Sequence, residues 1–556
     1  MTTDVQFDMI MSINNCVYES PKLSNTIHGG KPIYINGENM KRLLFSLSIS
    51  LLLLLSACQK KEAFNRVDAN GDTRTQSSAE NGGLWPAVTP TEPAIPDEVN
   101  NEEPSGNAPS EEDAGKHAEE GASKYENYED KYKTGKFTGP LVHGVTSDML
   151  KPSFWIDQYD GADKILMTYE MTEQYNKKNL ESLPFLRDLK TLPETVKGEE
   201  VLNWINELSI APKSARYDEK GNKYQQGDYE RFKENLNIGK IEKTINVEYG
   251  LTVRRTQLRT WPSIKPSFSS AANQQYDYFT ETAVYAAEPV LIYHVSADGL
   301  WYFAEIYNYK GWIPAKDVAL CSKEELADYR APKDFLVVKV PVLFTPESYD
   351  KRVSQLQLDM GVTLPVLSKN SSGYEINYPV CNENNYLEFI KMTIPYSEDA
   401  STGFLDYTVE NVLIQAFRFL GEPYGWGGMN NARDCSAFVA DVYRSFGIVF
   451  PRNSDQQEKM KGSVSFNGKN RTERLKILDS LKPGTPLYMP GHAMIYLGKW
   501  QDRHYIIHDV PAVYQKGTDD KLTPVRLNQV SVTPLDICNS KGLEYLMLLT
   551  TAVDIE

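Results

Sequence analysis

The sequence predicts an α+β protein of several domains, and three features support this fold class. A chain of 556 residues is too long for one hydrophobic core. Between residues 246 and 400, short β-rich runs are broken by Gly, Pro, Asp and Asn, which is typical of small barrels. Residues 401–556 combine amphipathic helices with alternating strands. Residues 133–245, before the barrels, favour helices and loops.

The N-terminal part has the features of an export leader. Residues 1–39 precede a better start, Met40, and we interpret them as an upstream extension. Residues 40–57 join a Lys-Arg pair to an apolar stretch, Leu43 to Leu55, which is shorter than the roughly 20 residues of a membrane-spanning helix. The stretch ends in Leu-Ser-Ala-Cys, which resembles a bacterial lipobox. The resemblance implies a lipidated Cys58 as the mature N-terminus; an uncleaved anchor is the alternative.

Acidic residues are concentrated after this leader. The formal net charge of −16 argues against a nucleic-acid partner, which would need a basic face. Thirteen acids lie between Glu92 and Asp130, so the acidity belongs to one segment and says little about a substrate. Residues 58–132 are therefore predicted to be a disordered tether. Gln59, which follows Cys58 where an inner-membrane signal would have Asp, favours the outer membrane.

Two helices are predicted within residues 133–245. The run from Ala162 to Leu180 has apolar residues, among them Ile165 and Tyr169, at an imperfect helical spacing. The second helix runs from Glu199 to Leu208. Because the segment contains no catalytic constellation, we expect it to stabilise the other domains.

A strand, turn and strand pattern stands out within residues 246–325. The apolar run Val290–Tyr293 is followed by an Asp-Gly turn, the aromatic run Trp301–Phe303 and a closing Gly311–Ile313. This order resembles a bacterial SH3 domain. Residues 326–400 are predicted, mainly from their position, to form a second SH3-like barrel.

Tryptophans of the first barrel have two interpretations. Core packing is favoured for Trp261, Trp301 and Trp312 taken singly. Those that are exposed would instead form a wall for a glycan or peptide ligand. Glu281 and Trp301 are the candidates for substrate selection.

Cys435 is the candidate nucleophile. Two amphipathic helices, from Thr408 to Leu420 and from about Cys435 to Phe446, flank a Gly-rich loop. Cys435 therefore lies near a helix N-terminus, where unpaired amides favour the thiolate and should lower the thiol pKa. A nucleophilic cysteine needs that change. A buried packing residue is the alternative.

Three of the seven histidines, His492, His504 and His508, fall within seventeen positions. If the two strands around them pair as a hairpin centred on position 500, His492 stands directly opposite His508, close enough for one imidazole to orient the other. His504 would lie at the turn, exposed to solvent. An exposed cross-strand pair and a zinc site are alternatives, but zinc usually takes three or four ligands. No metal or organic cofactor is therefore predicted.

The motifs Tyr-Gly-Trp-Gly-Gly, Asp-Cys-Ser and Gly-His-Ala, with a second histidine sixteen residues later, resemble the NlpC/P60 family of papain-like cysteine peptidases. The resemblance covers about residues 405–556. It implies that Cys435 is the nucleophile, His492 the general base and His508 the third polar residue. The whole order resembles the subgroup that cleaves γ-D-glutamyl-diamino acid bonds.

The resemblance extends to the residues around the nucleophile. It places Tyr424 near the oxyanion, Asp434 and Ser436 in the pocket, and Ser454 in a substrate-facing loop. Asp434 would meet the free amine of an N-terminal L-alanine. Each of these four could equally be local structure, such as a helix cap. Ala437 departs from the glycine of many relatives.

The sequence thus predicts a monomeric, lipid-anchored envelope enzyme that hydrolyses peptidoglycan or muropeptides. Two alternatives stay open. One is an amidase or acyltransferase acting on another envelope substrate. The other is a non-catalytic wall-binding lipoprotein. Retention of Cys435, His492 and His508 together favours an enzyme.

Overall fold

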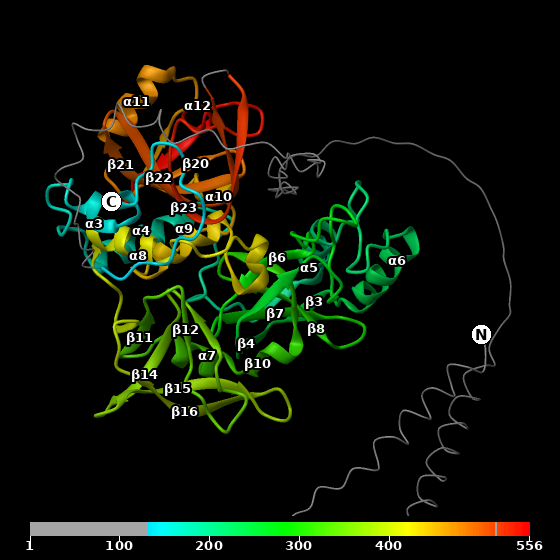
Figure 1. Ribbon diagram of the computed structural model, residues 1–556. Helices are drawn as coiled ribbons and strands as arrows, with labels where there is room; N and C mark the ends of the chain where they lie inside the picture. Colours follow the sequence, from blue (N-terminus) through cyan, green and yellow to red (C-terminus); the bar gives the residue numbers. More distant parts are fainter. Residues whose placement is uncertain (1–131, 518–519) are drawn as a thin grey trace, which may run out of the picture. The chain divides into compact units, whose positions relative to one another are not determined.

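The computed structural model describes residues 132–517 and 520–556 (Figure 1). The predicted extension, leader and lipidation site at Cys58 lie outside these residues, as does nearly all of the predicted tether. Within the described ranges, no helix combines the length and apolarity needed to cross a membrane.

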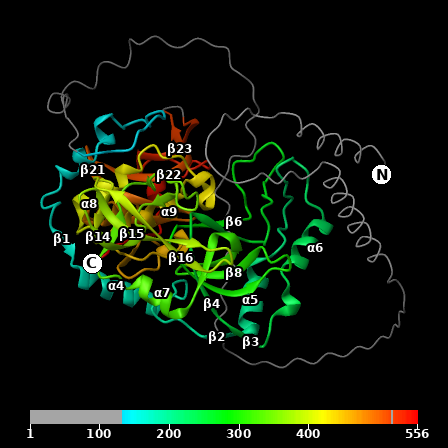
Figure 2. The same cartoon turned by 90° about the horizontal axis from the view of Figure 1, so that it is seen from below.

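The C-terminal part is built on a six-stranded antiparallel sheet in the order β19-β24-β20-β21-β22-β23. Two apolar helices, α8 and α9, contact each other, and α9 packs on β21 and β22 (Figure 2). The elements are α8 (Val409–Arg418), α9 (Cys435–Arg444), α10 (Ser454–Gln457), β19 (Ser463–Ser465), α11 (Arg471–Ser480), β20 (Pro486–Met489), β21 (His492–Trp500), β22 (Arg503–Lys516), β23 (Leu522–Pro534), α12 (Tyr545–Leu548) and β24 (Thr551–Val553).

The first barrel is a seven-stranded antiparallel sheet in the order β10-β4-β7-β8-β9-β5-β6. The predicted succession of apolar strand, turn, aromatic strand and closing strand is confirmed, because β7, β8 and β9 pair in sequence. The elements are β4 (Glu248–Thr252), β5 (Thr256–Arg259), β6 (Thr280–Val284), β7 (Pro289–Val295), β8 (Trp301–Ile306), β9 (Tyr309–Pro314), η4 (Ala315–Asp317) and β10 (Val318–Cys321).

A second β segment follows the helix α7 (Lys323–Arg330). Its main sheet has the order β16-β15-β14-β11-β17, and β12 pairs with β13 beside it. Its buried Leu336, Leu364 and Ile376 belong to a separate core, to which residues 285–287 of the first barrel also contribute. The strands are β11 (Phe335–Val338), β12 (Val342–Phe344), β13 (Gln357–Asp359), β14 (Thr363–Lys369), β15 (Gly373–Cys381), β16 (Leu387–Pro395) and β17 (Ala400–Thr402).

The segment before the first barrel divides its buried residues between two cores. Residues such as Trp155 join the core of α8 and α9, whereas residues such as Val201 join that of the first barrel. The elements are η2 (Asp148–Leu150), α3 (Pro152–Ile156), β1 (Ile165–Met167), α4 (Tyr169–Ser182), β2 (Thr195–Lys197), α5 (Gly198–Leu208), α6 (Gln226–Asn235), η3 (Ile238–Lys240) and β3 (Thr244–Asn246); β1 pairs with β18 (Tyr407–Thr408) and β2 with β3.

The helix predicted from Ala162 is partly wrong. Ile165–Met167 forms a strand because it pairs with Tyr407–Thr408, and α4 begins only after Thr168, whose hydroxyl accepts a hydrogen bond from the amide of Met171. The buried face of α4 is mainly polar, and Asn176 donates to the carbonyl of Gly447 at 2.8 Å. Long-range contacts therefore overrode the apolar spacing. The predicted helix from Glu199 to Leu208 is confirmed as α5.

Candidate active site

Cys435 is the first residue of α9, as the sequence predicted. Asp434 caps the helix, because its Oδ1 accepts a hydrogen bond from the amide of Ala437 at 3.0 Å. The buried Phe438 and Val442 hold the helix in the core. The thiol is therefore fixed at a helix N-terminus, beside the beginning of β21, where the backbone of Ala493 hydrogen-bonds the sulfur.

The predicted lowering of the thiol pKa is wrong for this state of the site. Burial, with a smaller contribution from the Asp434 carboxylate, raises the pKa of Cys435 to about 12 despite the contact with Ala493. Burial also lowers the pKa of His492 to about 4. Burial, together with the negative charge of Asp434, therefore outweighs the effect of the helix N-terminus. The thiol and the imidazole are both neutral at pH 7.

His492 and His508 form a buried hydrogen-bonded pair. The Nε2 atom of His492 lies 2.8 Å from Nδ1 of His508, and Nε2 of His508 lies 3.0 Å from Oγ1 of Thr533. The ring of Tyr545 packs edge-on against both imidazoles. If each Nε2 carries the proton, His492 donates to His508, which donates to Thr533. The remaining nitrogen, Nδ1 of His492, is then free to accept a proton.

The predicted strand register is wrong, although the predicted contact forms. Ile495 pairs with Ile507, whereas a hairpin centred on position 500 would pair it with Tyr505. The turn lies at Gln501 and Asp502, both with positive φ, and a bulge between Tyr496 and Gly498 moves the pairing back by one residue toward the predicted register. The two histidines are consequently diagonal neighbours across the strands.

His504 is not exposed as predicted. It is 4% exposed, and its Nδ1 lies 2.7 Å from the hydroxyl of Tyr496. The turn is confined to Gln501 and Asp502, so His504 pairs with Lys499 and falls inside the paired strands. Its hydrogen bond is separate from the pair formed by His492 and His508.

Asp434 and Ser436 belong to a buried network centred on Arg452. Arg452 contacts Asp434 Oδ2 at 2.5 Å and the hydroxyl of Ser436 at 2.8 Å. Asp434 also accepts from the amide of Gly427 at 3.0 Å and from Ser436 at 3.1 Å. Burial acts to raise the pKa of Asp434, but Arg452 and the amides of Ala437 and Gly427 together outweigh it, and the pKa is lowered. The helix-cap interpretation of Asp434 therefore holds, and its charge already has an internal partner.

The sequence did not identify Arg452, although it belongs to the loop that contains Ser454. Ser454 is the first residue of α10 and is half-buried, and Asn453 caps that helix. The loop singled out in the sequence therefore contained Arg452. The partner of the arginine, Asp434, is eighteen positions away and could not be inferred from local spacing.

Tyr424 lies at the entrance of the loop that leads to Cys435. Its ring is mostly buried and meets that of Tyr276 edge-on at 6.0 Å, and Tyr276 also meets Trp426. Burial, and then the nearness of Cys435, raises the pKa of Tyr424 well above its ordinary value. Its phenol is therefore a neutral hydrogen-bond donor close to the sulfur.

The first barrel borders this site. Nε of Arg452 donates to Thr282 of β6 at 2.6 Å. Glu281, next to it, accepts hydrogen bonds from Thr260 at 2.5 Å and Tyr309 at 2.6 Å. Burial raises the pKa of Glu281, and Arg452 acts against that shift. The structure thus brings the strand of Glu281 to the Arg452 side of the site.

Trp301 does not form an exposed wall. Its side chain is 4% exposed and packs in the core of the first barrel, and Trp261 and Trp312 are fully buried. The ring of Phe303 contacts Trp312 at 5.4 Å. Core packing therefore accounts for all three tryptophans, which belong to the same buried cluster.

We also looked for side chains that could bind a metal ion in the described part of the chain. Over residues 132–517 and 520–556, no group of three or more His, Cys, Asp or Glu side chains is arranged to hold a metal ion. The cysteines described there, Cys321, Cys381, Cys435 and Cys538, are all free thiols.

Residues 421–517 match the model of the NlpC/P60 family, and residues 265–314 match that of an SH3 domain of the SH3b1 type. The chain contains an NlpC/P60 domain. The match begins before Tyr424 and includes Cys435, His492 and His508. The predicted combination of an NlpC/P60 domain with a bacterial SH3 domain is therefore confirmed.

Curated relatives carry related names. The chain is 26% identical over 153 residues to a gamma-D-glutamyl-L-lysine dipeptidyl-peptidase of Bacillus cereus, in a match covering 27% of this chain and 44% of the relative. It is 22% identical over 216 residues to the protein of the same name in Bacillus subtilis, covering 38% and 67%. The chain thus spans less than half of the length of the Bacillus cereus relative.

A solved NlpC/P60 endopeptidase from Photobacterium damselae subsp. piscicida has the same fold. It superposes with a TM-score of 0.60 at 16% identity, covering 72% of this chain and 96% of that one. The predicted mixed α and β fold class is confirmed by this likeness together with the two domain matches.

Proposed function

We propose that this protein is a cysteine peptidase that hydrolyses peptidoglycan stem peptides at the γ-D-glutamyl-diamino acid bond. The observation that carries the proposal is the buried chain of His492, His508 and Thr533 beside a cysteine at the start of α9. The names of the Bacillus relatives support the choice of bond. Cys435 is the nucleophile, His492 the base and His508 the residue that orients it.

The reaction begins with two neutral groups. His492 accepts the thiol proton through Nδ1 as the sulfur of Cys435 attacks the γ-carbonyl carbon. The carbonyl oxygen becomes an oxyanion, which the amide of Cys435 and the phenol of Tyr424 stabilise. His492 then gives its proton to the leaving amine of the diamino acid. Water hydrolyses the remaining thioester, and the thiol is restored.

The neutral resting state has a functional consequence. Burial disfavours both the thiolate and the imidazolium, so the resting thiol is poorly reactive toward small electrophiles. Attack is favoured when a bound substrate presents its carbonyl to the sulfur. His508 and Thr533 then stabilise the imidazolium that forms.

The position of β6 beside Arg452 supports a preference for peptides with a free N-terminal L-alanine. Asp434 is a weaker candidate for the ammonium group, since Arg452 already neutralises it. Glu281 lies on the barrel side of the same site, and among the described residues it forms no ion pair; its carboxylate accepts hydrogen bonds from Thr260 and Tyr309. A free alanine ammonium would pair with Glu281, and Ser436 and Ser454 would line the pocket.

The leader and the domain matches also bear on where the enzyme acts. The export leader predicted at residues 40–57 and the two domain matches support action outside the cytoplasm. We propose that a lipid on Cys58 tethers a monomeric enzyme to the envelope, at the outer membrane, through residues 58–132.

To test the proposal, the full chain is incubated separately with L-Ala-γ-D-Glu-diaminopimelate, with the N-acetylated form of this peptide and with intact peptidoglycan. The released products are identified by mass spectrometry. The wild type should release L-Ala-γ-D-Glu from the free peptide, and Cys435→Ala should release none. His504→Ala is the matched control, since His504 is a buried histidine of the same hairpin and lies outside the chain formed by His492, His508 and Thr533. It should retain activity.

Two outcomes would count against the proposal. A folded, reduced wild type that releases nothing from any of the substrates would remove the endopeptidase function. Equal rates on the free and N-acetylated peptides would remove the preference for a free amine while leaving the peptidase intact.

A further inference from the structure

The loop between Tyr424 and Cys435 has a backbone that needs support from outside. Within Trp426–Asn431 the glycines Gly427 and Gly428 have φ of 58° and 89°, and Asn430 and Asn431 have φ of 55° and 59°. Four of the five consecutive residues 427–431 are therefore in the left-handed region. This conformation costs free energy, particularly for the two asparagines, which have a Cβ. A Cβ at Gly428 would also lie 2.5 Å from that of Ala283.

Arg255, just before β5 of the first barrel, holds this loop by its carbonyl groups. Its Nη1 donates to the carbonyl of Gly428 at 3.0 Å, and its Nη2 donates to that of Ala432 at 2.8 Å. Gln357 of β13 donates to the carbonyl of Asn431 at 3.2 Å. The planar fork of a guanidinium suits two carbonyls held at fixed positions.

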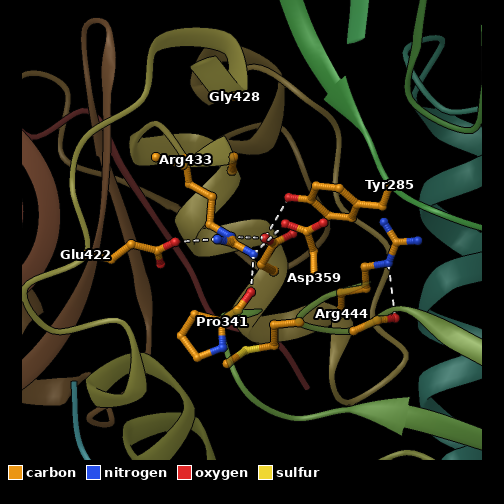
Figure 3. A network of polar contacts seen from close by, with 12 residues as sticks. Tyr285, Pro341, Asp359, Glu422, Gly428, Arg433 and Arg444 are labelled. Carbon is orange, nitrogen blue, oxygen red and sulfur yellow. Dashed lines mark hydrogen bonds and ion pairs between the residues drawn. The ribbon is translucent and has the colours of Figure 1, made fainter. Parts of the chain in front are cut away.

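Asp359, the last residue of β13, holds that arginine and a second one. Its Oδ1 accepts from Nε of Arg255 at 3.1 Å and from Nη2 of Arg433 at 2.9 Å. The carboxylate is 0% exposed. Arg433 immediately precedes Asp434 and Cys435, so Asp359 is joined to both ends of the stretch that shapes the site (Figure 3).

Arg433 is in turn fixed from the catalytic side. It contacts Asp441 of α9 and Glu422, each at 2.5 Å, and donates to the carbonyl of Pro341 at 2.6 Å. Its guanidinium lies over the ring of Phe419. Figure 3 shows Asp359, Glu422 and Pro341 converging on the arginine from different segments of the chain.

We propose that Asp359 of the second β segment is a positioning residue for the active site, which acts through Arg255 on the loop Trp426–Asn431 and through Arg433 on the start of α9. The proposal deepens the proposed peptidase function and rests on it. The second β segment is thereby part of the catalytic apparatus, although it supplies no reacting atom.

Asp359→Asn is a suitable test variant because the buried network keeps balanced positive and negative charges without this carboxylate. Two guanidiniums, of Arg255 and Arg433, share three carboxylates, of Asp359, Glu422 and Asp441. Removing one negative charge leaves two of each sign. The variant should therefore fold, while both arginines lose a charged acceptor and the loop loses its anchor.

Glu288→Gln is the matched control. Glu288 is also buried, and it pairs with Arg444 of α9 across the same junction. Figure 3 shows Arg444 beside the network. Among the described residues, the side chain of Glu288 hydrogen-bonds Arg444 and not the loop, so this variant loses a comparable ion pair without touching the site.

The experiment measures backbone hydrogen exchange of residues 425–434 by mass spectrometry, together with kcat and KM on the free tripeptide. Asp359→Asn should accelerate exchange in this stretch and reduce kcat/KM by about tenfold, because a misplaced loop costs orientation. Arg255→Lys should have the same effects on exchange and on kcat/KM, since lysine keeps the positive charge but cannot donate to both carbonyls with the planar geometry of a guanidinium. Glu288→Gln should change each quantity by less than about twofold.

Two results would overturn the proposal. One is wild-type exchange of residues 425–434 in Asp359→Asn. The other is an equal acceleration in Glu288→Gln, which would indicate a general loosening of the junction. If the wild type cleaves no peptide but exchange still separates the two variants, the peptidase function fails and the support of the loop by Asp359 stands.

Discussion

Thr533→Val offers a sharp test of how the histidines are oriented. Thr533 is fully buried on β23, and its Oγ1 lies 3.0 Å from Nε2 of His508. Valine has nearly the same shape, so the packing is kept while the hydroxyl is lost. In the base-competent arrangement Nε2 of His508 donates to that hydroxyl, and in the variant this N–H has no acceptor.

The magnitude follows from the cost of the lost acceptor. A buried donor left without a partner costs about 1–3 kcal/mol. That penalty falls on the base-competent tautomer, so His508 turns to the alternative in which Nδ1 carries the proton and donates to His492. His492 is then protonated on Nδ1 and cannot accept the thiol proton. At roughly 1.4 kcal/mol per tenfold, kcat should fall about 5- to 150-fold.

The assay is release of L-Ala-γ-D-Glu from the free tripeptide under saturating conditions, with thermal unfolding measured in parallel. Thr533→Ser is the control, since serine keeps an acceptor oxygen and should keep kcat within about threefold. KM should change little in either variant, because Thr533 does not reach the substrate. A Thr533→Val enzyme with wild-type kcat would refute the proton arrangement proposed for the two histidines.

Two further predictions concern buried acids near the site. Asp509 is 0% exposed, its carboxylate oxygens have no hydrogen-bond partner within the described residues, and burial, then Glu422 and Asp434, raises its pKa well above the ordinary value. A raised acid pKa makes the folded state bind more protons, so wild-type stability falls as pH rises above about 4. The melting temperature of Asp509→Asn relative to wild type should therefore rise from pH 5 to pH 8, and a constant difference would contradict this. Asp434→Asn leaves Arg452 buried without its charge partner and should cost roughly 3–5 kcal/mol in urea unfolding at pH 7; a loss no larger than that of the exposed pair variant Asp399→Asn would contradict it.

The sequence by itself determined the local elements of the site. The apolar spacing after Asp434 predicted α9 with Cys435 at its start, and the alternation around His492 predicted β21. Both depend on residues within one or two turns or strand repeats, which a single sequence displays. The turn and strand order of the first barrel could be predicted for the same reason.

Distant partners were decided only by the tertiary structure. The bulge after Tyr496 set the register of the histidines, and the pairing of Ile165–Met167 with β18 replaced a predicted helix turn. Neither the partner of Thr533 nor that of Asp359 follows from local spacing, since 104 positions separate Arg255 from Asp359.

The pKa of the Cys435 thiol shows most clearly the difference between what local sequence predicts and what the tertiary structure decides. A helix N-terminus predicts a lowered value, and the sequence places Cys435 there. The actual direction depends on how much protein surrounds the sulfur and on the charge of Asp434 beside it. Desolvation is a property of the assembled core, so no pattern along the chain could have revealed it.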